Sequence, residues 1–128
     1  MPVTHAVVWI DHREAKIFGL SRDSATELVL HDGHVPKHIH RKADNVHLGK
    51  VQPDHAFFDE VAGSLAAFKA ILITGPGEAR TQFAGYLNEE YPLLAKKVWR
   101  IEPMDHPTEP RLIAAARKYF KAADRMHA

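Results

Sequence analysis

The feature of the sequence that most constrains the fold is a short run near the amino terminus, HAVVWI (His5–Ile10), which is apolar almost throughout. A strand with one solvent-facing side would alternate between polar and apolar residues, and this run does not. It is typical of a strand buried on both faces, which needs a covering layer on each side of the sheet. The run therefore predicts an interior strand of a sheet with helices on its faces.

The order of the remaining hydrophobic patterns predicts the topology. Polar turns separate the first run from two more strand-like segments, so the three strands form an antiparallel meander. From residue 54 onwards, segments with helical spacing alternate with short apolar strands, which implies parallel pairing through crossover connections. The expected elements are strands at Ala15–Leu20, Thr26–Leu30, Ala70–Thr74 and Val98–Glu102, and helices that begin at Asp54, Glu78 and Thr108. We therefore predict a ribonuclease-H-like α/β fold, with a mixed five-stranded sheet and helices on its faces.

Length and composition indicate a single domain covering residues 1–128, with a His/Lys-rich loop at 31–53 that we call the basic loop. The formal net charge of +1 gives no overall field for a polyanion, so any nucleic-acid signal must come from local clusters. The absence of cysteine excludes disulfides and cysteine-based zinc sites. With no secretory signal and no apolar segment of about 20 residues, we expect a cytoplasmic protein outside the membrane.

One consequence of the predicted topology is that four strands end at the same edge of the sheet. In a meander the third strand runs the same way as the first, and the fourth and fifth strands are parallel to the first. The segments that follow these strands are Asp11 with His12, the basic loop, Gly75–Gly77, and Asp105 with His106. The carboxyl edge of parallel strands is where open α/β sheets bind ligands, so this edge is the predicted functional site. A plain set of polar loops is the competing interpretation.

The basic loop holds five of the ten histidines of the chain within HDGHVPKHIHRKADNVHLGK (31–50). Cations that bind phosphates and imidazoles that stack on bases together predict contact with nucleic acid. The residues expected to make this contact are His34, Lys37, His38, His40, Arg41 and Lys42. Pro36 disfavours a regular helix, and no carboxylate or cysteine pattern completes a zinc site, so we expect no metal and no cofactor. A solvated connecting loop is the alternative.

A second basic pattern lies on the last helix. Arg111, Lys118 and Arg125 recur at seven-residue spacing, which places them in one stripe opposite the apolar face. We expect these three residues to add to the contact with nucleic acid. The alternative is that the stripe is an ordinary solvated surface of the helix.

The segment TGPGEA (Thr74–Ala79) joins a strand to a helix through two glycines. Backbone N–H groups of Gly75 and Gly77 at a helix start could bind a phosphate or a carboxylate. The Walker pattern is absent, however, and Glu78 would repel an anion. A tight strand-to-helix turn is the competing interpretation of this segment.

Four residues of the edge are candidates for catalysis, namely Asp11, His12, Asp105 and His106. Converging carboxylates hold metal ions in ribonuclease-H-type nucleases. Here Asp11 follows the first strand instead of lying within it, and the fourth strand ends in Thr-Gly-Pro where such enzymes carry an acid. No nucleophile motif is present, so the sequence leaves open whether the chain catalyses any reaction.

Taken in order, these motifs resemble a known family. AVVWIDHREAKIFGL (6–20) and ILITGPGEARTQFAGYL (71–87) are similar to the central domain of the archaeal and eukaryotic peptide release factors and of the ribosome-rescue factor Pelota. DHPT (105–108) and AARKYF (115–120) also resemble small bacterial relatives that are often labelled translational machinery proteins. The resemblance covers nearly the whole chain and implies the same ribonuclease-H-like fold.

The resemblance stops at the catalytic loop of the release factors. That loop follows the third strand and carries Gly-Gly-Gln, whereas the segment 31–50 contains Gly33 and Gly49 but no adjacent glycines and no glutamine. The resemblance thus implies a translation-associated protein that binds the ribosome or RNA without peptide-release catalysis. The alternative is a metal- or histidine-assisted hydrolase that acts at the carboxyl edge. A homo-oligomer is a further arrangement that the sequence leaves open.

Overall fold

The computed structural model describes residues 4–21, 24–31 and 55–127, with side chains up to Asp124 in the last helix. Within these residues the strands form one mixed sheet in the order β3-β2-β1-β4-β5. The strands are β1 (His5–Ile10), β2 (Glu14–Leu20), β3 (Ala25–His31), β4 (Ala70–Gly75) and β5 (Val98–Pro103). β2 is antiparallel to β1 and β3, whereas β4 is parallel to β1 and β5. The predicted fold class and strand order are confirmed.

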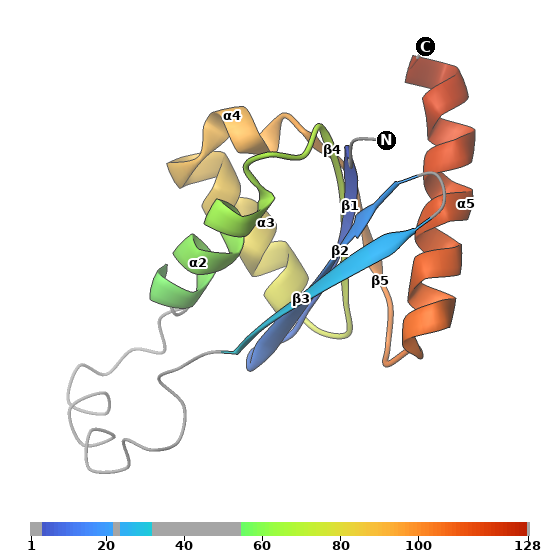
Figure 1. Cartoon of the computed structure of the whole chain (residues 1–128). Coiled ribbons are helices and arrows are strands. Elements are labelled where there is room, and N and C mark those ends of the chain that lie inside the picture. Colours follow the sequence, from blue (N-terminus) through green and yellow to red (C-terminus); the bar gives the residue numbers. More distant parts are fainter. Residues whose placement is uncertain (1–3, 22–23, 32–54, 128) are drawn as a thin grey trace, which may run out of the picture.

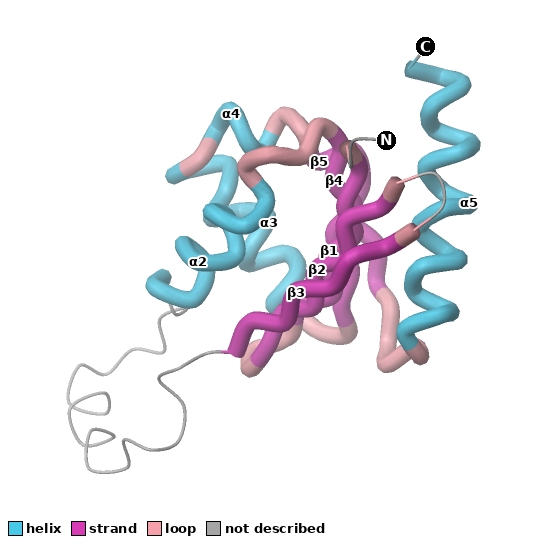
Figure 2. The backbone as a smooth tube through the Cα atoms, in the orientation of Figure 1, coloured by secondary structure: helices cyan, strands magenta, loops and turns pink. Residues whose placement is uncertain are grey.

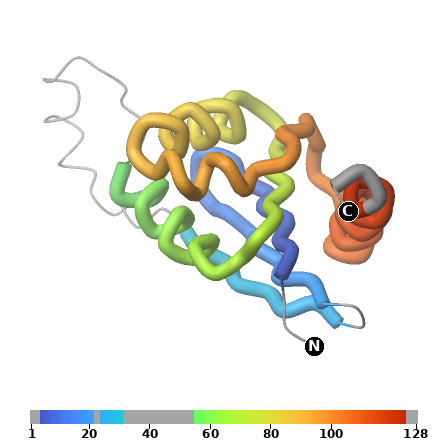
Figure 3. Tube along the Cα trace, turned by 90° about the horizontal axis from the view of Figure 1, so that it is seen from above, coloured from blue at the N-terminus to red at the C-terminus, as the bar shows by residue number. Residues whose placement is uncertain are grey.

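Helices cover both faces of the sheet (Figures 1 and 2). The helices are α2 (His55–Leu65), α3 (Ala79–Glu90), α4 (Pro92–Ala95) and α5 (Glu109–His127). Seen from above, α2, α3 and α4 lie together on one side of the sheet and α5 lies on the other (Figure 3). Pro92 begins the single turn of α4. Asp54, the expected start of the first helix, lies outside the described residues.

These two layers explain why β1 carries no polar alternation. Ala6, Val8 and Ile10 pack with α2 and α3 in one core. Val7 and Trp9 pack in a second core against α5. All of these β1 side chains are at most 4% exposed, so both faces of the strand are buried as predicted. The α5 residues that complete the second core are Leu112, Ala116 and Phe120.

The centre of the sheet depends on a close approach between β1 and β4. At the end of β4, Gly75 has a φ of 155°, and a Cβ added to it would lie 2.2 Å from the carbonyl oxygen of Ile10. One residue earlier, the buried hydroxyl of Thr74 donates to the carbonyl oxygen of Val8 at 2.7 Å. Glycine is required at position 75 because any side chain would collide with the backbone of β1.

We expect Gly75→Ala to destabilise the fold by about 3 kcal/mol or more, because the added methyl group would force β4 away from β1. Gly77→Ala is the matched control in the same loop. A Cβ at Gly77 would meet no atom within 4 Å, so its substitution should change stability by no more than about 0.5 kcal/mol. Urea denaturation of both variants measures the difference, and equal unfolding midpoints would contradict the close approach.

Candidate functional site

The structure brings the ends of β1, β3, β4 and β5 to one edge of the sheet. In the strand ladders, Trp9 pairs with Thr74, and Gly75 pairs with Pro103. At the other side of β1, Glu14 at the start of β2 pairs with His31 at the end of β3. The segments after these strands therefore share one edge, as the topology predicts. The described chain stops at His31 and resumes at His55, so the basic loop leaves from this edge.

Asp11 holds the turn between β1 and β2. Its Oδ1 accepts hydrogen bonds from the backbone N–H groups of Arg13 at 2.7 Å and Glu14 at 2.9 Å. The backbone N–H of Asp11 also donates to the carbonyl oxygen of Glu14 at 3.0 Å. The neighbouring His12 is exposed. This geometry gives Asp11 a structural task in the turn, which is what aspartate commonly does in this position.

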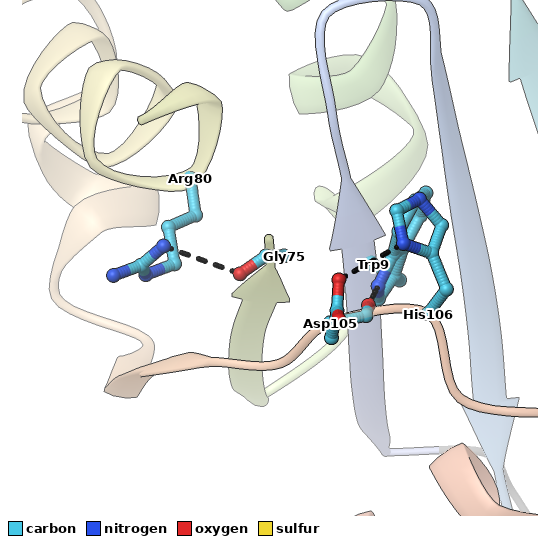
Figure 4. Close-up of polar contacts among 5 residues, drawn as sticks. All are labelled: Trp9, Gly75, Arg80, Asp105 and His106. Carbon is cyan, nitrogen blue, oxygen red and sulfur yellow. Dashed lines mark hydrogen bonds and ion pairs between the residues drawn. The ribbon is translucent and has the colours of Figure 1, made fainter. Parts of the chain in front are cut away.

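Asp105 and His106 form a pair on the loop after β5 (Figure 4). His106 Nδ1 lies 3.0 Å from Asp105 Oδ1, and both side chains are largely exposed. The indole N–H of Trp9 donates to the carbonyl oxygen of Asp105 at 2.7 Å, and the rings of Trp9 and His106 are 5.1 Å apart. The buried tryptophan thus fixes the loop to β1. In the described part of the chain, no Ser or Thr hydroxyl is hydrogen-bonded to His106.

A small pocket of about 80 Å³ lies beside this pair, and Trp9, Lys16, His106 and Glu109 are among its lining residues. The ammonium group of Lys16 lies 5.8 Å from the centroid of the Trp9 ring, which allows a cation–π contact. A water molecule takes up roughly 30 Å³. The pocket therefore has room for a few waters or a small ion and is too small for a nucleotide. A larger hollow of about 440 Å³ lies beside α2 and α4, lined in part by Leu93 and Lys97.

An arginine holds the turn at Gly75–Gly77, which joins β4 to α3. The guanidinium of Arg80, from the first turn of α3, donates to the carbonyl oxygen of Gly75 at 3.2 Å (Figure 4). It also donates to the carbonyl oxygen of Gly77. The backbone N–H of Met104 also donates to the carbonyl oxygen of Gly75 at 2.9 Å. These contacts account for the turn without a ligand. The anion site expected at Gly75 and Gly77 stays a prediction.

The basic stripe on α5 is exposed at Arg111 and Lys118, whereas the side chain of Arg125 lies outside the described part. Arg117, which the sequence did not single out, has a different role. Its guanidinium donates to the carbonyl oxygens of Ser21 at 2.7 Å and Ser24 at 2.9 Å. It thereby ties α5 to the turn between β2 and β3. The loop residues expected to contact nucleic acid also lie outside the described residues: His34, Lys37, His38, His40, Arg41 and Lys42.

A cluster of polar aromatic groups joins α2 to α3 next to the point where the described chain resumes. Asp59 on α2 accepts hydrogen bonds from the hydroxyls of Tyr86 and, at 2.8 Å, Tyr91. The ring of His55 lies 4.8 Å from that of Tyr86. The two hydrogen bonds lower the pKa of the Asp59 carboxyl below its ordinary value of 3.8 and raise the pKa of both tyrosines. We call this group the tyrosine clamp.

Two absences apply to residues 4–21, 24–31 and 55–127. No three His, Cys, Asp or Glu side chains lie where they could share a metal ion. None of the helices is long and apolar enough to cross a bilayer.

Comparison with known proteins gives matches among solved structures. No family model matches the sequence, and no curated protein sequence matches it significantly. Pelota of Archaeoglobus fulgidus superposes with a TM-score of 0.63 at 20% identity over 89% of this chain and 30% of that one. Pelota of Thermoplasma acidophilum gives a TM-score of 0.59 at 24% identity, and the match covers 92% of this chain and 32% of that Pelota. The archaeal translation termination factor aRF1 gives a TM-score of 0.60 at 19% identity, and the match covers 96% of this chain and 39% of aRF1.

These matches define the class of fold. The chain has the architecture of a domain found in Pelota and in aRF1, and the predicted resemblance is confirmed at that level. The match spans about a third of the length of each of those longer proteins. At such low identity the likeness establishes the fold and leaves the activity to be argued from this chain's own residues.

The tyrosine clamp predicts a dependence of stability on pH. Because the folded-state pKa of Asp59 is below its unfolded value, its contribution to stability is complete above pH 3.8 and is lost as the pH falls through the folded-state pKa. We expect Asp59→Asn to be less stable than the wild type at neutral pH and the gap to close in acid. Chemical denaturation across this pH range measures it.

The matched control for this prediction is Glu60→Gln, which removes the next carboxylate on the same helix, exposed and outside the tyrosine clamp. Its free energy of unfolding should equal that of the wild type at neutral pH. A gap between Asp59→Asn and the wild type that stays constant down to the acid limit would contradict the clamp.

Proposed function

We propose that this chain is a translation-associated protein that binds the ribosome or RNA through the basic loop and does not catalyse peptide release. The observation that most supports this is the fold that it shares with a domain of Pelota and of a translation termination factor. In this fold the basic loop joins β3 to α2 at the carboxyl edge of the sheet. A role in translation would also imply a cytoplasmic location.

The composition of the basic loop supports contact with a polyanion. Its stretch HVPKHIHRK (34–42) contains Lys37, Arg41 and Lys42 and no aspartate or glutamate. Lysine and arginine bind phosphates and release counterions, which makes the affinity sensitive to salt. The histidines between them offer flat rings for stacking on unpaired bases. The loop thus combines the two kinds of group that single-stranded nucleic acid binding requires.

The start of α5 offers a further cation on the side of the carboxyl edge. Arg111 lies in the first turn of α5, just after the Asp105–His106 loop, and its side chain is exposed. Lys118 and Arg125 lie further along the helix, away from the edge. We therefore propose Arg111 as a secondary contact and assign smaller contributions to the other two.

The residues of the basic loop and of the carboxyl edge fit a binding function better than a hydrolytic one. The basic loop lacks the Gly-Gly-Gln of the release factors. Of the candidate catalytic residues, Asp11 holds a turn and the Asp105–His106 pair stands without a hydroxyl partner in the described part of the chain. Among the described residues, the Asp105–His106 pair is an arrangement that a hydrolase could use.

The proposal is tested by co-sedimentation of the untagged protein with ribosomes from its native host at low and at high salt. We expect the protein to migrate with ribosomal particles at low salt and to dissociate at high salt, because phosphate contacts are screened. Migration at the top of the gradient under both conditions would contradict the proposal.

The part played by the basic loop is tested by changing Lys37, Arg41 and Lys42 together to alanine. The affinity for ribosomes or RNA should fall, and the slope of log K against log salt should become shallower by roughly 2 units, at about 0.7 per phosphate contact. The charge-matched control changes Lys69, Lys96 and Lys97, which precede β4 and β5 at the opposite edge. An equal loss of affinity in both triple variants would show that the effect is one of net charge alone.

A further inference from the structure

The outer side of β3 carries a regular row of free backbone groups. The backbone N–H of Ser21 donates to the carbonyl oxygen of Ser24 at 2.9 Å, which sets the alternation of the β2–β3 ladder. In an antiparallel ladder, every second residue of a strand turns its N–H and C=O to the neighbour and the others turn away. Because Ser24 faces β2, the even-numbered residues of β3 also face β2. The odd-numbered residues therefore turn their N–H and C=O groups outward: Ala25, Glu27, Val29 and His31. In the described part of the chain, no strand pairs with this side.

This edge lacks the features that protect exposed strands. Natural edge strands are blunted by charged residues, by proline or by bulges. β5, the other edge, has Arg100, Pro103 and a register shift in its pairing with β4. β3 has none of these, apart from one glutamate, and its residues Leu28 and Val29 are 45% and 37% exposed. The β3 edge is therefore competent to add another strand.

We propose that the β3 edge pairs antiparallel with β3 of a second copy of this chain, about a two-fold axis at Val29. The paired sheets would then form one continuous sheet across the dimer. Leu28 would face Leu30 of the partner subunit, and Glu27 would face His31 of the partner subunit. A two-fold interface of this kind is self-complementary and closes as a dimer.

The side chains favour this register over those centred on Glu27 and on Leu28. An axis at Glu27 would place two carboxylates directly opposite each other, which is destabilising. An axis at Leu28 would place Glu27 opposite valine and leave its charge unmatched. The axis at Val29 instead gives Glu27 an imidazole, that of a His31 whose Nδ1 lies 3.7 Å from Glu14 Oε1 in its own subunit. Each β3 carries both halves of this contact, since Glu27 and His31 stand two residues to either side of Val29.

The surroundings of Glu27 also favour a cation from outside the subunit. Glu27 lies near Glu109 on α5, and desolvation together with the neighbouring Glu109 carboxyl raises the pKa of Glu27. Lys16 is the nearby group that opposes this. A second copy would bring a histidine to the carboxylate pair. Complementary charge of this kind fixes the register of an interface more than it adds affinity.

A single strand pair buries little area, so we expect a weak dimer that forms only at high concentration. Sedimentation velocity of the full chain over a range of concentrations measures the equilibrium. Val29→Pro removes an outward N–H without breaking a hydrogen bond to β2, and it should weaken dimerisation about tenfold or more. Val29→Thr keeps the N–H and the shape, and it should dimerise like the wild type.

The register has its own test because the chain has no cysteine. In Val29→Cys the new residue would face its own copy, at a Cα separation of about 5.5 Å that a disulfide can bridge. Under mild oxidation it should form a covalent dimer much faster than Ala114→Cys, a control on the exposed surface of α5. A wild type that stays monomeric at every concentration would overturn the proposal. A monomer is the result expected if residues 32–54 of the same chain, or an unrelated peptide, occupied the edge in place of a second copy. Equal rates of cross-linking for the two cysteine variants would overturn the register.

Discussion

The parallel pairing of β1 with β4 is the interaction on which the rest of the molecule depends. It requires the chain to pass so close to Ile10 that only glycine fits at position 75, and a buried hydrogen bond from Thr74 to Val8 reinforces it. With this pair in place, β1 lies in the interior of the sheet and needs a helical layer on each face. Together with the antiparallel β1–β2–β3 meander and the parallel pairing of β4 with β5, the same pairing brings the ends of β1, β3, β4 and β5 to one edge. The site that we propose exists because of that convergence.

Much of this architecture follows from the sequence, because it depends on local patterns. The continuous apolar run at His5–Ile10 requires two covering layers, and the structure provides them. Chain direction then follows from the short turns and crossover helices, and it correctly predicts which segments share the carboxyl edge. The spacing of Leu112, Ala116 and Phe120 likewise predicts the face of α5 that is buried. Local periodicity and chain direction are sufficient for these features.

Contacts between residues far apart in the sequence could not be predicted in the same way. The hydrogen bond from Trp9 to Asp105, the contacts of Arg117 with the β2–β3 turn and the tyrosine clamp all depend on how packed elements meet. Asp11 shows the converse, since a carboxylate predicted as a candidate for catalysis is committed to its own turn. The basic loop is defined by composition, and composition identifies a charge pattern without giving the position of each side chain.

The most direct test of the account is photo-cross-linking in the native host. A photo-reactive amino acid is placed either at His38 in the basic loop or at Lys96, an exposed position at the opposite edge. The account predicts cross-links to ribosomal RNA or ribosomal protein from position 38 and a background level from position 96. Cross-links from position 96 alone, or none from position 38 in ribosomal fractions, would contradict it. In that case the fold shared with the translation factors would be all that this chain has in common with them.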